Sequence, residues 1–178
     1  MSDLEKLRYP IGQFQKPPKV TTENLKQWIQ QIETLPSRFR KLAKPLTKKQ
    51  LDTPYRPGGW TLRQVIHHVP DSHVNSYVRF KWTLTEDTPI IKAYNEAAWA
   101  KLADYGSVPV ETSLDFLEIL HARWVPLLKS LTEEELNKAF IHPEHGKEVP
   151  LKVNVGIYAW HGEHHLGHLK QTIEYNKW

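Results

Sequence analysis

The sequence predicts an all-α protein, a four-helix bundle with a long crossover between its second and third helices. Apolar residues recur at three- and four-residue spacing over four separate stretches, capping signals precede several of them, and little of the chain has a strand pattern. A chain of 178 residues can bury one well-packed core. We therefore interpret residues 1–178 as one domain, with residues 1–20 as an extended N-terminal arm.

Cap residues define where most of the expected helices begin. The first starts at Thr21 or Thr22 and runs to about residue 44. The second starts at Thr61, where a glutamine three residues later completes a capping box. The third begins at Ser113, which we interpret as its N-cap, and the fourth spans residues 151–175.

The segment 83–112 is expected to be the crossover, because prolines and a glycine bracket a single short helix near Asn95–Leu102. Connections of this length typically cover a functional site. A second capping box, formed by Thr132 and Glu135, predicts a short helix before a small strand pair. These features place the long connection between the second and third bundle helices.

Composition excludes several classes of protein. The absence of cysteine rules out disulfides, thiolate metal sites and a cysteine nucleophile. A net charge of +4 arises from 24 basic and 20 acidic residues, so we expect no nucleic-acid partner. No apolar run approaches the roughly 20 residues that span a bilayer, and no secretory signal core is present, so we expect no membrane partner and a cytoplasmic location.

Four histidines fall within eight positions of the last expected helix. Side chains four residues apart lie on the same helix face, so His161 and His165 form one pair, and His164 and His168 form another. The apolar stripe of this helix has His165 at its edge and His161 just beyond it, whereas the second pair points further away. The periodicity therefore favours His161 and His165 as the pair that faces the interior.

A tightly bound metal that keeps a position for substrate needs a third protein ligand. His67, His68 and His73 lie on the second expected helix, and periodicity does not choose between His67 and His68. Three neutral imidazoles suit zinc, nickel or cobalt. The motifs of HExxH proteases and of zinc deaminases are absent, the latter because their second half needs cysteine.

The segments PYRPGGWTLRQVIHHVPDSH, KAYNEAAWAKLAD and YAWHGEHHLGH resemble the DinB/YfiT-like family of metal-binding four-helix bundles. The resemblance extends over nearly the whole chain and is most specific to the YfiT-like branch. It implies one divalent ion per chain, zinc or nickel, held by His67, His161 and His165. The resemblance thus selects His67, whereas periodicity does not distinguish His67 from His68.

The resemblance also implies an enzyme with a small-molecule substrate. Related members are thiol S-transferases or isomerases that use bacillithiol or mycothiol, and the group was first described as metal-dependent hydrolases. The sequence favours the transferase, because no carboxylate is clearly placed as a general base; Asp71 could serve as one, or could orient an imidazole. Arg56 could hold the carboxylates of a thiol such as bacillithiol.

Two alternatives remain open: a hydrolase that uses a metal-bound water, and a non-catalytic metal-binding stress protein. The sequence assigns no catalytic side chain. Seven tryptophans and the proline-rich arm also predict a homodimer.

Overall fold

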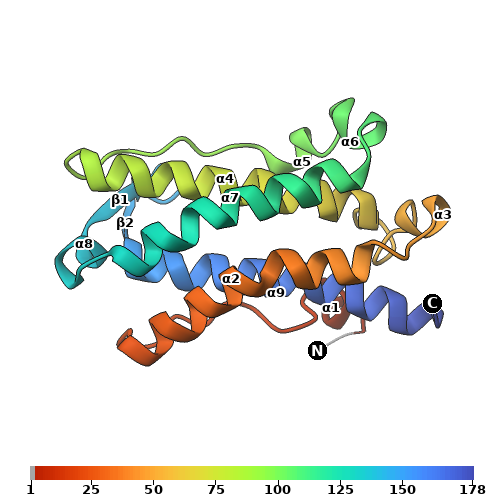
Figure 1. Ribbon diagram of the computed structural model, residues 1–178, viewed down its shortest axis with the longest axis horizontal. Coiled ribbons are helices and arrows are strands. Elements are labelled where there is room, and N and C mark those ends of the chain that lie inside the picture. Colours follow the sequence, from red (N-terminus) through yellow and green to blue (C-terminus); the bar gives the residue numbers. More distant parts are fainter. Residues whose placement is uncertain (1–2) are drawn as a thin grey trace.

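The computed structural model describes residues 3–178, and the side chains from Leu4 onward. Four long helices, α2, α4, α7 and α9, form the expected four-helix bundle, so the predicted fold class is confirmed (Figure 1). The elements in chain order are α1 (Asp3–Arg8), α2 (Thr22–Ala43), α3 (Lys48–Leu51), α4 (Leu62–Thr85), α5 (Glu96–Trp99), α6 (Asp104–Ser107), α7 (Val110–Ser130), α8 (Glu133–Asn137), β1 (Ala139–His142), β2 (Lys147–Pro150) and α9 (Leu151–Asn176).

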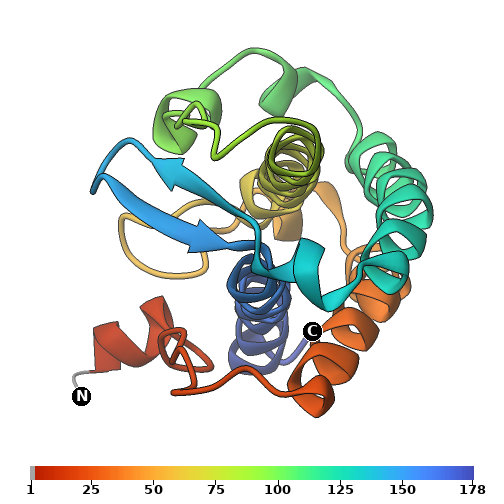
Figure 2. The same cartoon turned by 90° about the vertical axis from the view of Figure 1, so that its left-hand side faces the viewer.

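The four long helices form a ring in which each packs against two others. Helix α2 contacts α9 and α7, and α4 contacts the same two helices from the opposite corner (Figure 2). The colours in Figure 1 show that α4 and α7 run in the same direction, as do α2 and α9. The crossover makes this possible, because it returns the chain along the outside of the bundle before α7 begins.

Predicted caps start two of the bundle helices. Thr21 caps α2, and Thr61 caps α4 through a reciprocal capping box with Gln64. The expected start of α7 at Ser113 is wrong: the helix begins at Val110, with Pro109 at its N-cap, so Ser113 lies inside it. The side chain of Ser113 is therefore available for a contact with α4.

The N-terminal arm is not extended throughout. Residues 1–2 of the expected arm lie outside the described residues, and Asp3–Arg8 form helix α1. The arm then follows α9, since Trp160 Nε1 donates a hydrogen bond to the carbonyl of Gly12 and Gln171 Nε2 donates one to the carbonyl of Leu7. Figure 2 shows α1 beside α9 at one corner of the bundle.

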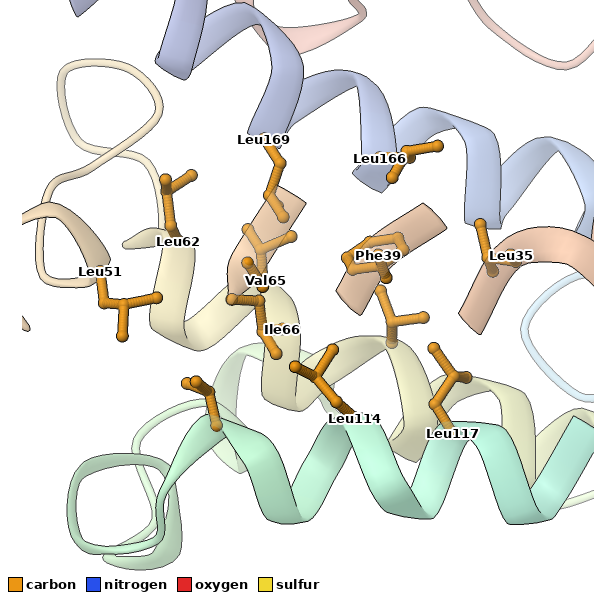
Figure 3. Packing of buried hydrophobic residues seen from close by; sticks show 13 residues of the cluster. Leu35, Phe39, Leu51, Leu62, Val65, Ile66, Leu114, Leu117, Leu166 and Leu169 are labelled. Carbon is orange, nitrogen blue, oxygen red and sulfur yellow. The ribbon is translucent and has the colours of Figure 1, made fainter. Parts of the chain in front are cut away.

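The interior consists of two apolar clusters with histidines between them. Figure 3 shows the first cluster, to which Phe39 of α2, Leu166 of α9 and Leu117 of α7 contribute. The second surrounds Trp124 and Phe80 nearer the hairpin end. Along α4, α7 and α9, the segments between the two clusters carry the buried or half-buried side chains of His73, His121, His161 and His165.

A small antiparallel hairpin closes one end of the bundle. Strands β1 and β2 pair Ala139 with Pro150 and His142 with Lys147, and Ile141 also bridges to Ile90 of the crossover. Gly146 makes the turn with a φ of 63°, a conformation that glycine adopts without steric cost. Over residues 3–178, no helix has both the length and the apolar character needed to cross a bilayer.

Candidate metal centre

Three imidazoles from two helices converge in the interior of the bundle, beside the first apolar cluster. His68 comes from α4, and His161 and His165 come from adjacent turns of α9. Each can offer a ring nitrogen such that the three atoms lie within 4.8 Å of one another. Nε2 of His68 and Nε2 of His161 are 3.1 Å apart. The i, i+4 spacing on α9 thus presents two rings to the same point, as the sequence predicted.

His67, which the family resemblance selected, does not lie in this group. Its Nδ1 is 2.7 Å from Oγ of Ser113 on α7, and its ring packs against Tyr105 of the crossover with centroids 5.4 Å apart. One residue along a helix is a rotation of about 100°, so the neighbouring His68 faces α9 instead. The structure therefore brings His161 and His165 together with His68, and places His67 on the α7 side of α4.

Burial keeps the three converging imidazoles neutral. It lowers the pKa of the His68 imidazole to about 4, with a smaller contribution from the neighbouring His164. Burial likewise lowers the pKa of His161 and of His165 well below the ordinary value of 6.5. His161 retains some exposed surface, whereas His68 and His165 are buried.

Trp60 packs against two rings of the group. Its ring lies 4.7 Å from that of His68 and is stacked at 6.5 Å over that of His165, measured between centroids. The PGG turn before α4 places it there, because Tyr55 and Trp60 are joined by a backbone hydrogen bond across the turn. The sequence offered no direct signal for this role, since tryptophan at the start of a helix ordinarily indicates core packing.

The nearby carboxylates are bound to other partners. Asp71 accepts a hydrogen bond of 2.7 Å from the hydroxyl of Tyr105, and burial raises its pKa. Glu163 forms a two-point ion pair with Arg38 of α2. Among residues 3–178, the two clusters able to hold a metal consist only of histidines.

The second cluster comprises His164, His165 and His168, all buried. The N-terminal arm and a turn residue cover it: Tyr9 lies 5.9 Å from His164, and Tyr55 stacks on His168 at 3.9 Å. The prediction that His164 and His168 point away from the apolar stripe did not anticipate their burial, because the arm that covers them has no periodic pattern.

The donor set of the first group fits a divalent ion. Three neutral imidazoles are the protein ligands of many catalytic zinc sites, in which a fourth position stays open. Nickel and cobalt accept the same nitrogen donors. The convergence of three buried rings on one point, with one of them partly accessible, agrees with a site of this kind.

Comparisons with known proteins agree with this fold. The sequence model of the DinB superfamily matches residues 31–169. Proteins named "Putative metal-dependent hydrolase" from Bacillus cereus and from Bacillus thuringiensis subsp. konkukian are each 54% identical over 175 residues, covering 98% of this chain and 100% of theirs.

Two solved structures share the fold. YfiT from Bacillus subtilis, described as a "probable metal-dependent hydrolase with an unusual four-helix bundle topology", has a TM-score of 0.94 and 42% identity, covering 97% of this chain and 99% of its own. The mycothiol-dependent maleylpyruvate isomerase has a TM-score of 0.64 and 16% identity, covering 82% of this chain and 60% of its own, which shows the fold alone. By its sequence and its bundle topology, the chain belongs to the DinB superfamily.

Proposed function

We propose that the protein is a divalent-metal-dependent transferase that activates a low-molecular-weight thiol, such as bacillithiol, for attack on an electrophile. One zinc or nickel ion per chain is held by His68, His161 and His165. The observation that carries the proposal is the composition of the centre: it offers three imidazoles and no carboxylate within either metal-holding cluster of residues 3–178.

This composition suits a substrate that brings its own nucleophile. A divalent ion held by three imidazoles supplies Lewis acidity, which lowers the pKa of a thiol or water bound to it. A hydrolase usually adds a carboxylate that accepts a proton from the attacking water. Here Asp71 is hydrogen-bonded to Tyr105, and Glu163 is paired with Arg38. A thiol needs less help, because its proton leaves more readily than that of water.

The proposed reaction balances without an oxidant or reductant. The thiol sulfur forms a bond to an electrophilic carbon, the bond from that carbon to its leaving group breaks, and the thiol proton is released to solvent or to the leaving group. The protein excludes water from the inner side of the centre, since His68 and His165 are buried and Trp60 lies over both.

A groove of about 780 Å³ beside α1 supports the proposal of a thiol substrate that carries carboxylates. Arg56 and Tyr55 line it, and Tyr55 stacks on His168, whose Nδ1 is 3.4 Å from Nδ1 of His165. The guanidinium of Arg56 uses one nitrogen for the carbonyl of Pro57. Its Nε is buried, so the other terminal nitrogen is the group that can donate to a carboxylate.

The names of the relatives support metal dependence, and the shared fold of a mycothiol-dependent isomerase supports a thiol substrate. The same names favour a second candidate, a hydrolase that uses a metal-activated water. The two candidates differ in one requirement. The transferase has no turnover without thiol, whereas the hydrolase needs none.

The test compares both reactions on the same zinc-loaded and nickel-loaded protein. Bacillithiol and a chlorinated fluorogenic electrophile are expected to give the thioether faster than the uncatalysed rate, and chelation of the metal abolishes the difference. An ester and an amide are offered without thiol in parallel. Metal-dependent hydrolysis of either would replace the transferase by the hydrolase, and no turnover in any arm with metal bound would leave a metal-binding protein.

A further inference from the structure

Two of the three rings in the candidate metal centre have their outer nitrogen against another histidine. Nδ1 of His161 lies 3.2 Å from Nε2 of His73, and Nδ1 of His165 lies 3.4 Å from Nδ1 of His168. A neutral imidazole carries one proton, so each contact joins one N–H donor to one bare acceptor. The position of that proton decides whether the inner nitrogen presents a lone pair or an N–H to an ion.

The first hydrogen-bonded chain of rings runs from His161 through His73 to His121 and ends on a backbone carbonyl. This carbonyl fixes the position of every N–H proton in the chain. Nδ1 of His121 lies 2.7 Å from the carbonyl oxygen of Ile32, and a carbonyl only accepts, so this Nδ1 carries the proton. Nε2 of His121 is then bare and accepts from Nδ1 of His73, 2.9 Å away. His73 in turn accepts through Nε2 from Nδ1 of His161. The inner Nε2 of His161 is thereby left with its lone pair.

The second chain ends in the same way on the N-terminal arm. Nε2 of His168 lies 3.2 Å from the carbonyl oxygen of Arg8 and donates to it. The bare Nδ1 of His168 then accepts from Nδ1 of His165. The other nitrogen of His165, Nε2, is left with its lone pair, as in His161.

We propose that His73, His121 and His168 are positioning residues, which hold His161 and His165 in the one tautomer that can bind an ion through Nε2. The inference rests on the ligand set proposed above and adds the residues that prepare it. Outer hydrogen bonds of this kind fix the tautomer and orientation of ligating histidines, and their loss typically lowers metal affinity by about 10- to 100-fold. His68 has no such partner among the described residues, since its Nδ1 is buried without a hydrogen bond.

The arrangement also distinguishes the two histidine clusters. A second ion between His164, His165 and His168 would need Nδ1 of His165 as a ligand, yet this nitrogen carries the proton that His168 accepts. The carbonyl of Arg8 already takes the proton of His168 on its other nitrogen. The two clusters therefore act as one metal centre and one hydrogen-bonded support, and the protein binds one ion per chain.

The first experiment determines the tautomers by long-range ¹H–¹⁵N correlation NMR on metal-free protein at about pH 8. His73, His121, His161 and His165 are expected in the Nδ1–H form and His168 in the Nε2–H form. The isolated imidazole of histidine favours Nε2–H, so four residues in the other form are not a default result. His161 or His165 in the Nε2–H form would overturn the proposal.

The second experiment measures zinc affinity by competition with a chromogenic chelator, with circular dichroism to confirm the fold of each variant. His121→Phe keeps an aromatic ring but removes the acceptor for His73, and the expected loss is about 10- to 100-fold. His121→Gln offers both a donor and an acceptor, so it is expected to restore affinity. If the zinc affinities of the wild type, His121→Phe and His121→Gln lie within twofold of one another, the proposed positioning role of His121 is overturned.

Two matched variants on α9 test the second hydrogen-bonded chain of rings, from His165 to His168. His168→Phe is expected to lose about 10- to 100-fold in affinity, whereas His164→Phe, which lies in the same buried cluster but outside both chains, retains it. Two ions per protein molecule in the wild type, falling to one in His164→Phe, would establish a second metal site. That result would overturn the proposed hydrogen-bonded series of His165 and His168. Because the readouts are tautomer and affinity, a failed thiol-transfer assay leaves the inference intact.

Discussion

Gly162 lies directly against Leu35 where α9 crosses α2. A Cβ built on Gly162 would overlap Cδ2 of Leu35 and lie 3.2 Å from its Cδ1, and Leu35 is 1% exposed. The glycine permits a close approach of the two helices immediately after His161. We expect Gly162→Ala to lower the free energy of unfolding by about 1–2 kcal/mol, because an overpacking cost of about 1–3 kcal/mol exceeds the gain of up to about 1 kcal/mol in helix propensity.

Urea unfolding of metal-free protein measures this change, with Gly106→Ala as the control. Gly106 is also helical, but a Cβ there meets nothing within 4 Å. The control is therefore expected to be neutral or up to about 1 kcal/mol more stable. Equal effects of the two substitutions would show that the contact with Leu35 is not what requires glycine.

The metal content of single variants tests the proposed ligands. His68→Ala is expected to purify with little bound ion, since two imidazoles on one helix hold an ion far more weakly than three. His67→Ala removes the adjacent histidine of equal burial, which contacts Ser113, and is expected to keep about one ion per chain. Elemental analysis after dialysis distinguishes the two, and the reverse result would assign the third ligand to His67.

Acid is expected to destabilise the metal-free protein between about pH 6.5 and pH 4. Burial lowers the pKa of His121 and of His68 to about 4, whereas the unfolded chain titrates near 6.5. Between these values the unfolded state binds more protons, so stability falls as the pH falls, and these groups contribute no pH dependence above the window. For His121 the full loss is about 3 kcal/mol.

Urea unfolding at several pH values in this range measures the effect, and His121→Gln isolates one group. As the pH falls from about 6.5 to about 4, the free energy of unfolding of the wild type is expected to fall relative to that of His121→Gln. A difference that stays constant would mean that His121 takes up its proton without loss of the fold.

The homodimer stays a prediction from the sequence. The chain mass is 20.8 kDa, so light scattering is expected to return about twice this value. Exposed apolar side chains of α7, Phe116 at 41% and Ile119 at 64%, offer surface for such contacts. A mass of one chain across the measured concentrations would remove the prediction.

Periodicity and caps predicted the bundle because the four long helices each bury a continuous face. The i, i+4 pair on α9 was predicted for the same reason, since a single regular helix fixes the relation between His161 and His165. Neither signal reaches across helices. The choice between His67 and His68 depends on how α4 is rotated about its axis, and partners on α7 and α9 fix that rotation.

Ser113 shows why the sequence could not make this choice. A serine before an apolar helical pattern ordinarily indicates an N-cap, but here the helix starts three residues earlier and the hydroxyl meets Nδ1 of His67. The roles of Arg8 and Ile32 were equally hidden, because backbone carbonyls carry no sequence signal. What the sequence missed in the site are contacts made between elements distant in the chain.

The histidines between the two apolar clusters also determine how the helices align lengthwise. In a bundle with a uniformly apolar interior, one helix can slip by a turn, about 5.4 Å, and exchange one leucine for another at small cost. A slip of α9 would place His161 against leucine or tryptophan and leave His73 without its partner, which costs about 1–3 kcal/mol for each unsatisfied buried group. The side chains that prepare the metal centre therefore also select one alignment of the bundle, before any ion is bound.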